Sequence, residues 1–197
     1  YDKKAQKLNY RYNKNLSIKK FHDIVRVRRI NNKSYIKGKL NIFWVGAHKD
    51  QDRSGFIQAL RSIGSVKEFY DMNGEYGQYF SGKDGVSRSF SEVRSINDKS
   101  LIDQIDKLNN QNGVDILIGQ MWSSTISKDV LLQVQKSVLI VNISMDDRLP
   151  EHWSTYHGTK LGSIGLAPSV DMVLTTSPET CKWYGVEGCL SLYFPLA

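Results

Sequence analysis

Residues 114–141 read VDILIGQMWSSTISKDVLLQVQKSVLIV and contain two short apolar runs with a helical pattern between them. The runs are Val114–Gly119 and Val138–Val141, and each has the hydrophobicity of a short buried strand. Between them, Ser127 is a good N-cap for a helix over 128–135, in which apolar side chains recur at helical spacing. A strand, a helix and a second strand in this order predict a parallel βαβ unit.

The same alternation extends in both directions along the chain. Further strands are predicted at 40–45, 66–70, 170–175 and 190–194, and further helices at 56–63, 98–110, 157–167 and from Ser177. Residues 71–85 carry four glycines and no periodicity, which indicates a loop or an irregular hairpin. Together these elements predict an α/β fold with a Rossmann-like, doubly wound parallel sheet that helices cover on both faces.

The composition is that of a globular chain. Of its 197 residues, 40% are hydrophobic and 24% are charged. No apolar run approaches the roughly 20 residues that cross a bilayer, and no secretory signal opens the sequence. Two cysteines, Cys181 and Cys189, are too few for a disulfide scaffold and are interpreted as small buried residues. We therefore expect a cytoplasmic protein, and the opening Tyr1 leads us to expect a piece of a longer polypeptide.

The net charge of +7 is unevenly distributed. Residues 1–39 hold thirteen Lys and Arg against two acids, which gives +11. Residues 40–197 hold fourteen Lys and Arg against eighteen acids, which gives −4. The sequence therefore divides into a basic leader at 1–38 and a mildly acidic domain at 39–197.

The leader is predicted to form a basic amphipathic helix, because Phe21, Ile24 and Val25 follow helical spacing among lysines and arginines. The alternative is a solvated linker or the tail of a preceding domain. Lys and Arg also contribute about 1 kcal/mol each near anionic lipid, so attachment of residues 1–37 to an anionic membrane surface stays open. Nucleic-acid binding is less favoured, because no base-stacking module accompanies the charge.

Ligands of an open parallel sheet bind beyond the carboxyl ends of its strands, where the following loops converge. The most suggestive polar feature there is the acidic pair Asp146-Asp147, since two adjacent carboxylates could supply a general base, hold a substrate hydroxyl or coordinate magnesium. The alternative for this pair is that one acid caps a helix and the other is solvated in a turn. His48 could instead be a surface turn residue, and Trp122 could serve only in packing. The predicted catalytic residues are Asp146, Asp147 and His48, and the predicted substrate-binding residues are Gly46, Asp50, Trp122 and Arg148.

Several cofactor signatures are missing from the sequence. Gly46 stands alone where a dinucleotide-binding fold needs G-x-G-x-x-G, and the chain has no G-x-x-x-x-G-K-[ST] phosphate loop. It also has no G-x-S-x-G elbow, no H-E-x-x-H array and no C-x-x-C pair. We therefore expect this domain to bind no metal and no cofactor of its own.

The C-terminal stretch resembles a known enzyme family. Residues 170–185, VDMVLTTSPETCKWYG, and LYFP at 192–195 are similar to the end of the N-terminal half of CgeB-like, spore-maturation-type glycosyltransferases. That family shows D-x-V-x-T-[TS]-x-P-E and then Y-x-P, with an acidic D-D turn one strand earlier, where residues 142–147 stand in this chain. The resemblance covers about residues 39–197 and leaves the basic leader outside.

The resemblance implies the acceptor-side domain of a GT-B glycosyltransferase, an enzyme that moves a sugar from a nucleotide-sugar to an acceptor hydroxyl on a glycan or cell-surface polymer. In that family the C-terminal domain holds the nucleotide-sugar donor, so the chain alone is expected to transfer no sugar. The implied cleft residues are Gly46–Asp50, Trp122 and the acidic pair. Two alternatives stay open, a non-catalytic Rossmann-like interaction module and a nucleotide-sugar epimerase on the same fold.

Overall fold

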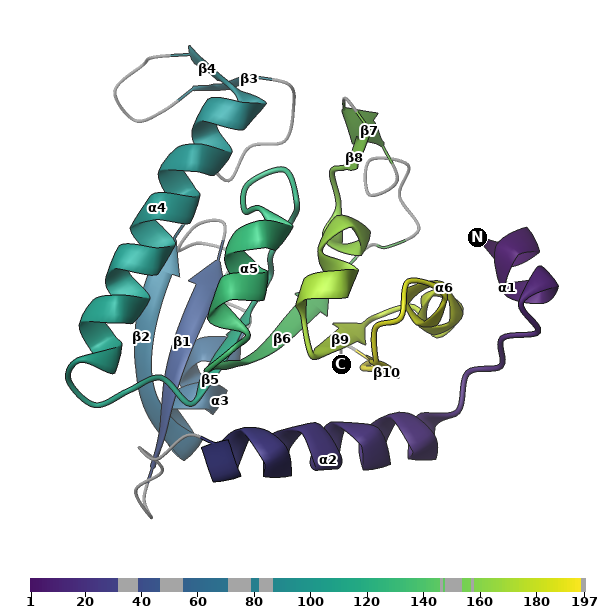
Figure 1. The fold of residues 1–197 in the computed structure, drawn as a ribbon, viewed down its shortest axis with the longest axis horizontal. Helices are drawn as coiled ribbons and strands as arrows, with labels where there is room; N and C mark the ends of the chain where they lie inside the picture. The colour runs from purple at the N-terminus through teal and green to yellow at the C-terminus, as the bar shows by residue number, and fades with distance from the viewer. Residues whose placement is uncertain are drawn as a thin grey trace.

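Six parallel strands form one sheet in the order β10-β9-β6-β5-β1-β2 in the computed structural model of the chain (Figure 1). The structure describes residues 1–31, 39–46, 55–70, 79–81, 87–145, 147, 154–156 and 158–195. The predicted Rossmann-like α/β fold is confirmed. The strands of the sheet are β1 (Leu40–Gly46), β2 (Gly64–Tyr70), β5 (Ile116–Gly119), β6 (Leu139–Ser144), β9 (Met172–Thr175) and β10 (Ser191–Tyr193).

Helices connect successive strands of the sheet, and two short antiparallel pairs lie outside it. The helices are α1 (Asp2–Lys7), α2 (Lys14–Asn31), α3 (Phe56–Ile63), α4 (Phe90–Asn109), α5 (Lys128–Val134), the 3-10 helix η3 (Ser163–Ser169) and α6 (Thr180–Val186). The antiparallel pairs are β3 (Tyr79–Ser81) with β4 (Ser87–Ser89) and β7 (Thr155–Tyr156) with β8 (Thr159–Lys160).

The larger core cluster lies between the sheet and the helices α4, α5, η3 and α6. Alternate strand residues such as Phe43, Leu117 and Val173 point to this face, as the period-2 geometry of a strand requires. The predicted inward residues of α5 are buried, and the backbone N–H of Val130 donates to the Ser127 hydroxyl at 3.3 Å. The N-cap predicted from the sequence is therefore present.

The opposite face of the sheet is covered by α3 near β1 and β2. There Trp44, Ile57 and Ile143 form a second buried cluster. Phe56 stacks on Trp44, with ring centroids 6.2 Å apart. Burial on both faces explains why the strands appear in the sequence as continuous apolar runs and not as alternating ones.

One helix in the structure is longer than the helix predicted from the apolar pattern. The sequence pattern predicts a helix over 98–110, whereas α4 begins at Phe90. Ser89 and Glu92 form a capping box, in which the serine hydroxyl accepts from the backbone N–H of Glu92 and the glutamate accepts from the backbone N–H of Ser89. This polar cap starts the helix eight residues ahead of the predicted start.

Two other segments also differ from the prediction. Residues 157–167, predicted as helical, contain part of the β7–β8 hairpin and then η3, and Gly158 takes a φ of +77° between the two hairpin strands. The strand predicted at 138–141 extends to Ser144, so the polar turn before the acidic pair starts later than expected. Ser144 thereby becomes a strand residue at the carboxyl edge.

The N-terminal segment is helical, as predicted, and packs against the domain. α1 contacts α6, and α2 contacts β10 (Figure 1). Asp2 forms an ion pair with Lys182 of α6 at 2.5 Å, and Ala5 is buried. Tyr10 lies so close to Gly185 that a Cβ on this glycine would overlap the tyrosine ring. The alternative of a solvated linker is therefore wrong for the first turns of the leader.

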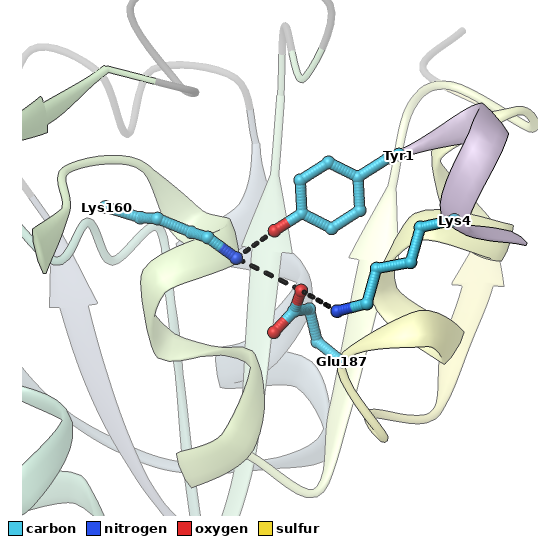
Figure 2. A network of polar contacts seen from close by, with 4 residues as sticks. All are labelled: Tyr1, Lys4, Lys160 and Glu187. Atoms are coloured by element: carbon cyan, nitrogen blue, oxygen red, sulfur yellow. Dashed lines mark hydrogen bonds and ion pairs between the residues drawn. The ribbon is translucent and has the colours of Figure 1, made fainter. Parts of the chain in front are cut away.

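An ionic network fastens α1 to the domain (Figure 2). The Lys160 ammonium donates to the Glu187 carboxylate at 3.0 Å and to the Tyr1 hydroxyl, and Lys4 lies 3.6 Å from the same carboxylate. Burial works to raise the pKa of Glu187, but hydrogen bonds from Tyr1 and Lys160 and the charges of the two lysines together hold that pKa below its ordinary value. The ionised carboxylate is thus the centre of the contact.

Replacing this carboxylate tests the network through its pH dependence. Glu187→Gln is expected to lower the Tm by about 2–4 °C at pH 7, which corresponds to about 1 kcal/mol. Because the pKa of Glu187 in the folded state lies below the ordinary value, the carboxylate stabilises the fold fully above about pH 5 and loses this effect as the pH falls below about 4.5. Thermal melts should therefore show the difference between the two proteins shrinking toward pH 3. Asp103→Asn on the exposed side of α4 is the control, and a pH-independent difference would contradict this role.

Candidate functional site at the carboxyl edge

The β1–β5 pair marks the point where the strand order of the sheet reverses. From β1 the chain crosses to β2 on one side, and it then crosses back to β5 on the other side of β1. Connections that leave two such strands in opposite directions open a crevice between them, which is where open α/β sheets bind ligands. β1 ends at the buried Gly46 and β5 ends at Gly119. The edge between these two glycines is the candidate site.

The two strands approach each other closely at this edge. A Cβ on Gly119 would lie 2.0 Å from the backbone oxygen of Val45 in β1. The next residue, Gln120, donates its backbone N–H to that same oxygen at 2.9 Å. The ladder thus continues one residue beyond β5. By the alternation of a strand, the Gln120 side chain projects to the same face as Ile118 and its partner Trp44.

Two hydrogen-bond donors near this edge have no acceptor in the part of the chain that the structure describes. The indole N–H of Trp44 and the side-chain amide nitrogen of Gln120 are both buried, and neither has a hydrogen-bond partner among the described residues. Trp44 itself has 0% of its surface exposed. A buried donor without an acceptor costs about 1–3 kcal/mol and is uncommon in folded proteins. Both donors lie near the strand-order reversal, and the partly exposed Gln120 is the residue of the two that a ligand at this edge could contact.

Aromatic rings line the same face of the sheet. Phe56 lies between Trp44 and Phe194, with its ring centroid 6.2 Å from the first and 6.1 Å from the second. The backbone N–H of Phe194 donates to the Thr175 carbonyl oxygen at 2.8 Å, which ties this ring to the carboxyl end of β9. We name Trp44, Phe56, Gln120 and Phe194 the aromatic corner. Its chemistry suits a ligand with apolar C–H faces and oxygen acceptors.

The loop after β5 is held rigidly beside the corner. Asn142 of β6 accepts from the backbone N–H of Met121 at 2.8 Å and donates to the Met121 carbonyl oxygen at 3.1 Å. The Ser163 hydroxyl donates to the same carbonyl at 3.2 Å, and Asn97 of α4 donates to the Thr125 carbonyl at 3.0 Å. This loop therefore presents Trp122, which is half-buried, at the edge where the sequence placed it. Its role in substrate binding stays a prediction.

Asp147 occupies a different environment from the one expected. The sequence suggested a carboxylate facing an open cleft, but the Asp147 side chain is only 2% exposed. Its carboxylate accepts from Thr175 at 2.5 Å, Tyr184 at 2.7 Å and Thr180 at 3.2 Å, and also from Ser144. Hydroxyl groups from β6, β9 and α6 enclose the Asp147 carboxylate at the carboxyl edge, so it is not open to solvent. A catalytic role for this residue stays a prediction.

The enclosed carboxylate joins three elements of the fold at the carboxyl edge. Ser144 ends β6, Thr175 ends β9, and Thr180 and Tyr184 lie on α6. Burial, and then the negative charge of Asp147, raise the pKa of Tyr184, so its hydroxyl keeps its proton and remains a donor. The signal for this network in the sequence was the set of hydroxyl residues that close apolar strands. The sequence alone could not show that they converge on one acid.

Four of the predicted site residues, His48, Asp50, Asp146 and Arg148, lie outside the described residues. Within the described part of the chain, no three His, Cys, Asp or Glu side chains are grouped so that they could hold a metal ion. Cys181 and Cys189 are free thiols and are buried, as the sequence suggested. In that same part of the chain, no helix has both the length and the hydrophobicity to cross a bilayer.

No family model, no curated protein and no solved structure matches this chain. A function therefore has to be inferred from the sheet topology and from the chemistry of the carboxyl edge.

Proposed function

We propose that the chain is the acceptor-side domain of a GT-B glycosyltransferase of the CgeB-like type. The observation that carries the proposal is the aromatic corner, where Trp44 stacks on Phe56 near the strand-order reversal and the side-chain N–H groups of Trp44 and Gln120 have no acceptor among the described residues. A sugar presents apolar C–H faces and many oxygen acceptors, and this corner offers a complement to both. The motif resemblance of residues 170–195 supports the same assignment.

In the proposed reaction, a second domain following Ala197 binds the nucleotide-sugar, and this domain holds the acceptor glycan or polymer. The acceptor oxygen bonds to the anomeric carbon of the sugar, the bond from that carbon to the diphosphate breaks, and the nucleoside diphosphate leaves. A carboxylate accepts the proton of the acceptor hydroxyl. Because four hydroxyl groups already engage Asp147, we assign the general base to its neighbour Asp146 and a positioning role to Asp147. His48, Asp50, Trp122 and Arg148 complete the proposed acceptor cleft.

The test is a transfer assay on the protein extended beyond Ala197, with a radiolabelled nucleotide-sugar in the presence and absence of acceptor. We expect transfer by the extended protein and none by residues 1–197. Gln120→Ala should lower kcat/KM for transfer about tenfold, the loss of roughly one hydrogen bond of 1.4 kcal/mol. Gln133→Ala, an exposed glutamine on α5, should leave transfer unchanged.

Two results would contradict the proposal. Sugar transfer by residues 1–197 alone would show that no second domain supplies the donor site. Conversion of the nucleotide-sugar into an isomeric nucleotide-sugar, in the absence of any acceptor, would favour an epimerase instead.

A further inference from the structure

The surface of α1, α2 and the turn between them is strongly basic. Between residues 1 and 27 two acids occur, and both are paired, Asp2 with Lys182 at 2.5 Å and Asp23 with Arg26 at 3.7 Å. The exposed cations of this segment are Lys3, Lys4, Lys7, Arg11, Lys14, Lys19, Lys20 and Arg26. We call these cations the basic surface. Residues 1–27 contribute a net charge of +6 and residues 28–39 a further +5, whereas residues 40–197 carry −4, so the positive charge is concentrated in the N-terminal segment.

Aliphatic side chains stand exposed among these cations. Leu8 is 59% exposed, Leu16 is 49% exposed and Val27 is 52% exposed. On α2, Leu16 and Val27 are eleven residues apart, which is close to three full turns, so they lie on one line of the helix. Lys20 and Asp23 fall on the same line between them.

The opposite side of α2 faces the domain. Its residues there are buried or half-buried, and α2 contacts β10 through this part of the molecule. The inward residues are Ser17, Ile18, Phe21, Ile24 and Val25. The exposed Leu16 and Val27 are therefore not needed for packing within the chain, and they leave an aliphatic and cationic stripe on the outer side of the helix.

We propose that the basic surface binds the surface of a bilayer that contains anionic lipids, with α2 lying flat in the headgroup region. Lysines and arginines pair with lipid phosphates there, while Leu16 and Val27 enter the boundary of the acyl chains. A nucleic-acid site would use exposed aromatic rings for base stacking, whereas the large apolar side chains exposed on the described part of this segment are aliphatic. The inference does not depend on sugar transfer.

The test is co-sedimentation of the chain with vesicles. Vesicles of phosphatidylcholine with about a third phosphatidylglycerol are compared with pure phosphatidylcholine vesicles, at low and at high salt. The chain is expected to bind the anionic vesicles and to dissociate as salt screens the charges. A unit charge near an anionic surface is worth about fivefold in binding, and Lys19→Glu with Lys20→Glu changes the charge by four units, so binding should weaken by roughly several hundredfold.

A second variant and a control separate lipid binding from simple attraction between charges. Leu16→Ser with Val27→Ser keeps every charge and should still weaken binding several-fold, because it removes the inserted aliphatic groups. Lys128→Glu with Lys136→Glu, on the exposed part of the α5 region, makes the same change in net charge and should bind almost as wild type. Thermal melting confirms that each variant is folded.

Three outcomes would overturn the proposal. The first is wild-type protein that stays in solution with anionic vesicles at low salt. The second is equal loss of binding in the control on α5, which would make net charge alone responsible. The third is wild-type binding to a single-stranded RNA of about 30 nucleotides that is tighter than binding to the vesicles, which would identify a nucleic-acid surface.

Discussion

Asp147→Asn is expected to lower the Tm by about 6–12 °C, which corresponds to about 3 kcal/mol in a chain of this size. The carboxylate of Asp147 accepts hydrogen bonds from Ser144, Thr175, Thr180 and Tyr184 in a site that is almost closed to water. An amide has one acceptor oxygen in place of two and brings two donors of its own. Hydroxyl groups that now donate to the acid would then be left without an acceptor.

The measurement is a thermal melt of the chain beside Asp106→Asn, an exposed acid on α4 that serves as the matched control. The control should melt within about 1 °C of wild type. If Asp147→Asn has the same Tm as the control, and the same substitution abolishes sugar transfer by the extended protein, the acid serves catalysis and not the fold. A large fall in Tm supports the assignment of Asp147 as the residue that positions the turn.

Gly119→Ala is the second substitution expected to have a large effect. The added Cβ would lie 2.0 Å from the Val45 oxygen, 2.8 Å from the Val45 carbonyl carbon and 2.9 Å from the Val45 Cβ. Two of these are backbone atoms of the neighbouring strand, and β1 lies between β2 and β5, so it cannot withdraw without breaking a ladder. We expect a loss of about 3 kcal/mol or more, seen as a Tm lowered by at least 6 °C or as failure to fold.

Gly185→Ala is the matched control for this substitution. Its Cβ would also overlap another group, at 1.8 Å, but that group is the end of the Tyr10 side chain. The ring can turn away, and alanine is the better helix former within α6, so the net change in Tm should be small. A Gly119→Ala protein as stable as Gly185→Ala would show that β1 and β5 separate at little cost at their carboxyl ends.

The sequence predicted the sheet well because its strands are buried on both faces. Runs such as Ile116–Gly119 and Val138–Val141 carry no polar side chain, and Ser127 marks the start of the helix between them as its N-cap. The beginning of α4 was missed because its first turns lack an apolar period and depend on the Ser89–Glu92 cap. The spacing of Ser89 and Glu92 is the local sequence signal for this helix start.

The sequence predicted that the candidate site lies at the carboxyl edge of the sheet, but it did not predict most of the residues that form the site. The order of the strands in the sheet determines which carboxyl ends are adjacent, and local sequence patterns do not predict that order. The pairing of Trp44 with Ile118 places Gln120 on the face of the tryptophan, and this register appears only when β1 and β5 lie side by side. Asp147 was recognised as an important acid, but its enclosure depends on Thr180 and Tyr184, which follow it by 33 and 37 residues.

The contacts of α1 with the C-terminal part of the domain affect the order in which native contacts form during synthesis. Asp2 contacts Trp183, which is 181 residues away, and Tyr1 contacts Lys160, which is 159 residues away. At roughly 5–20 residues per second, a ribosome takes about 10–40 s to deliver the partners of the first helix. During that interval the strands from β1 to β6 can pair, while α1 has nothing to bind. The domain therefore assembles from its middle outward, and its first residues are among the last to reach their native contacts.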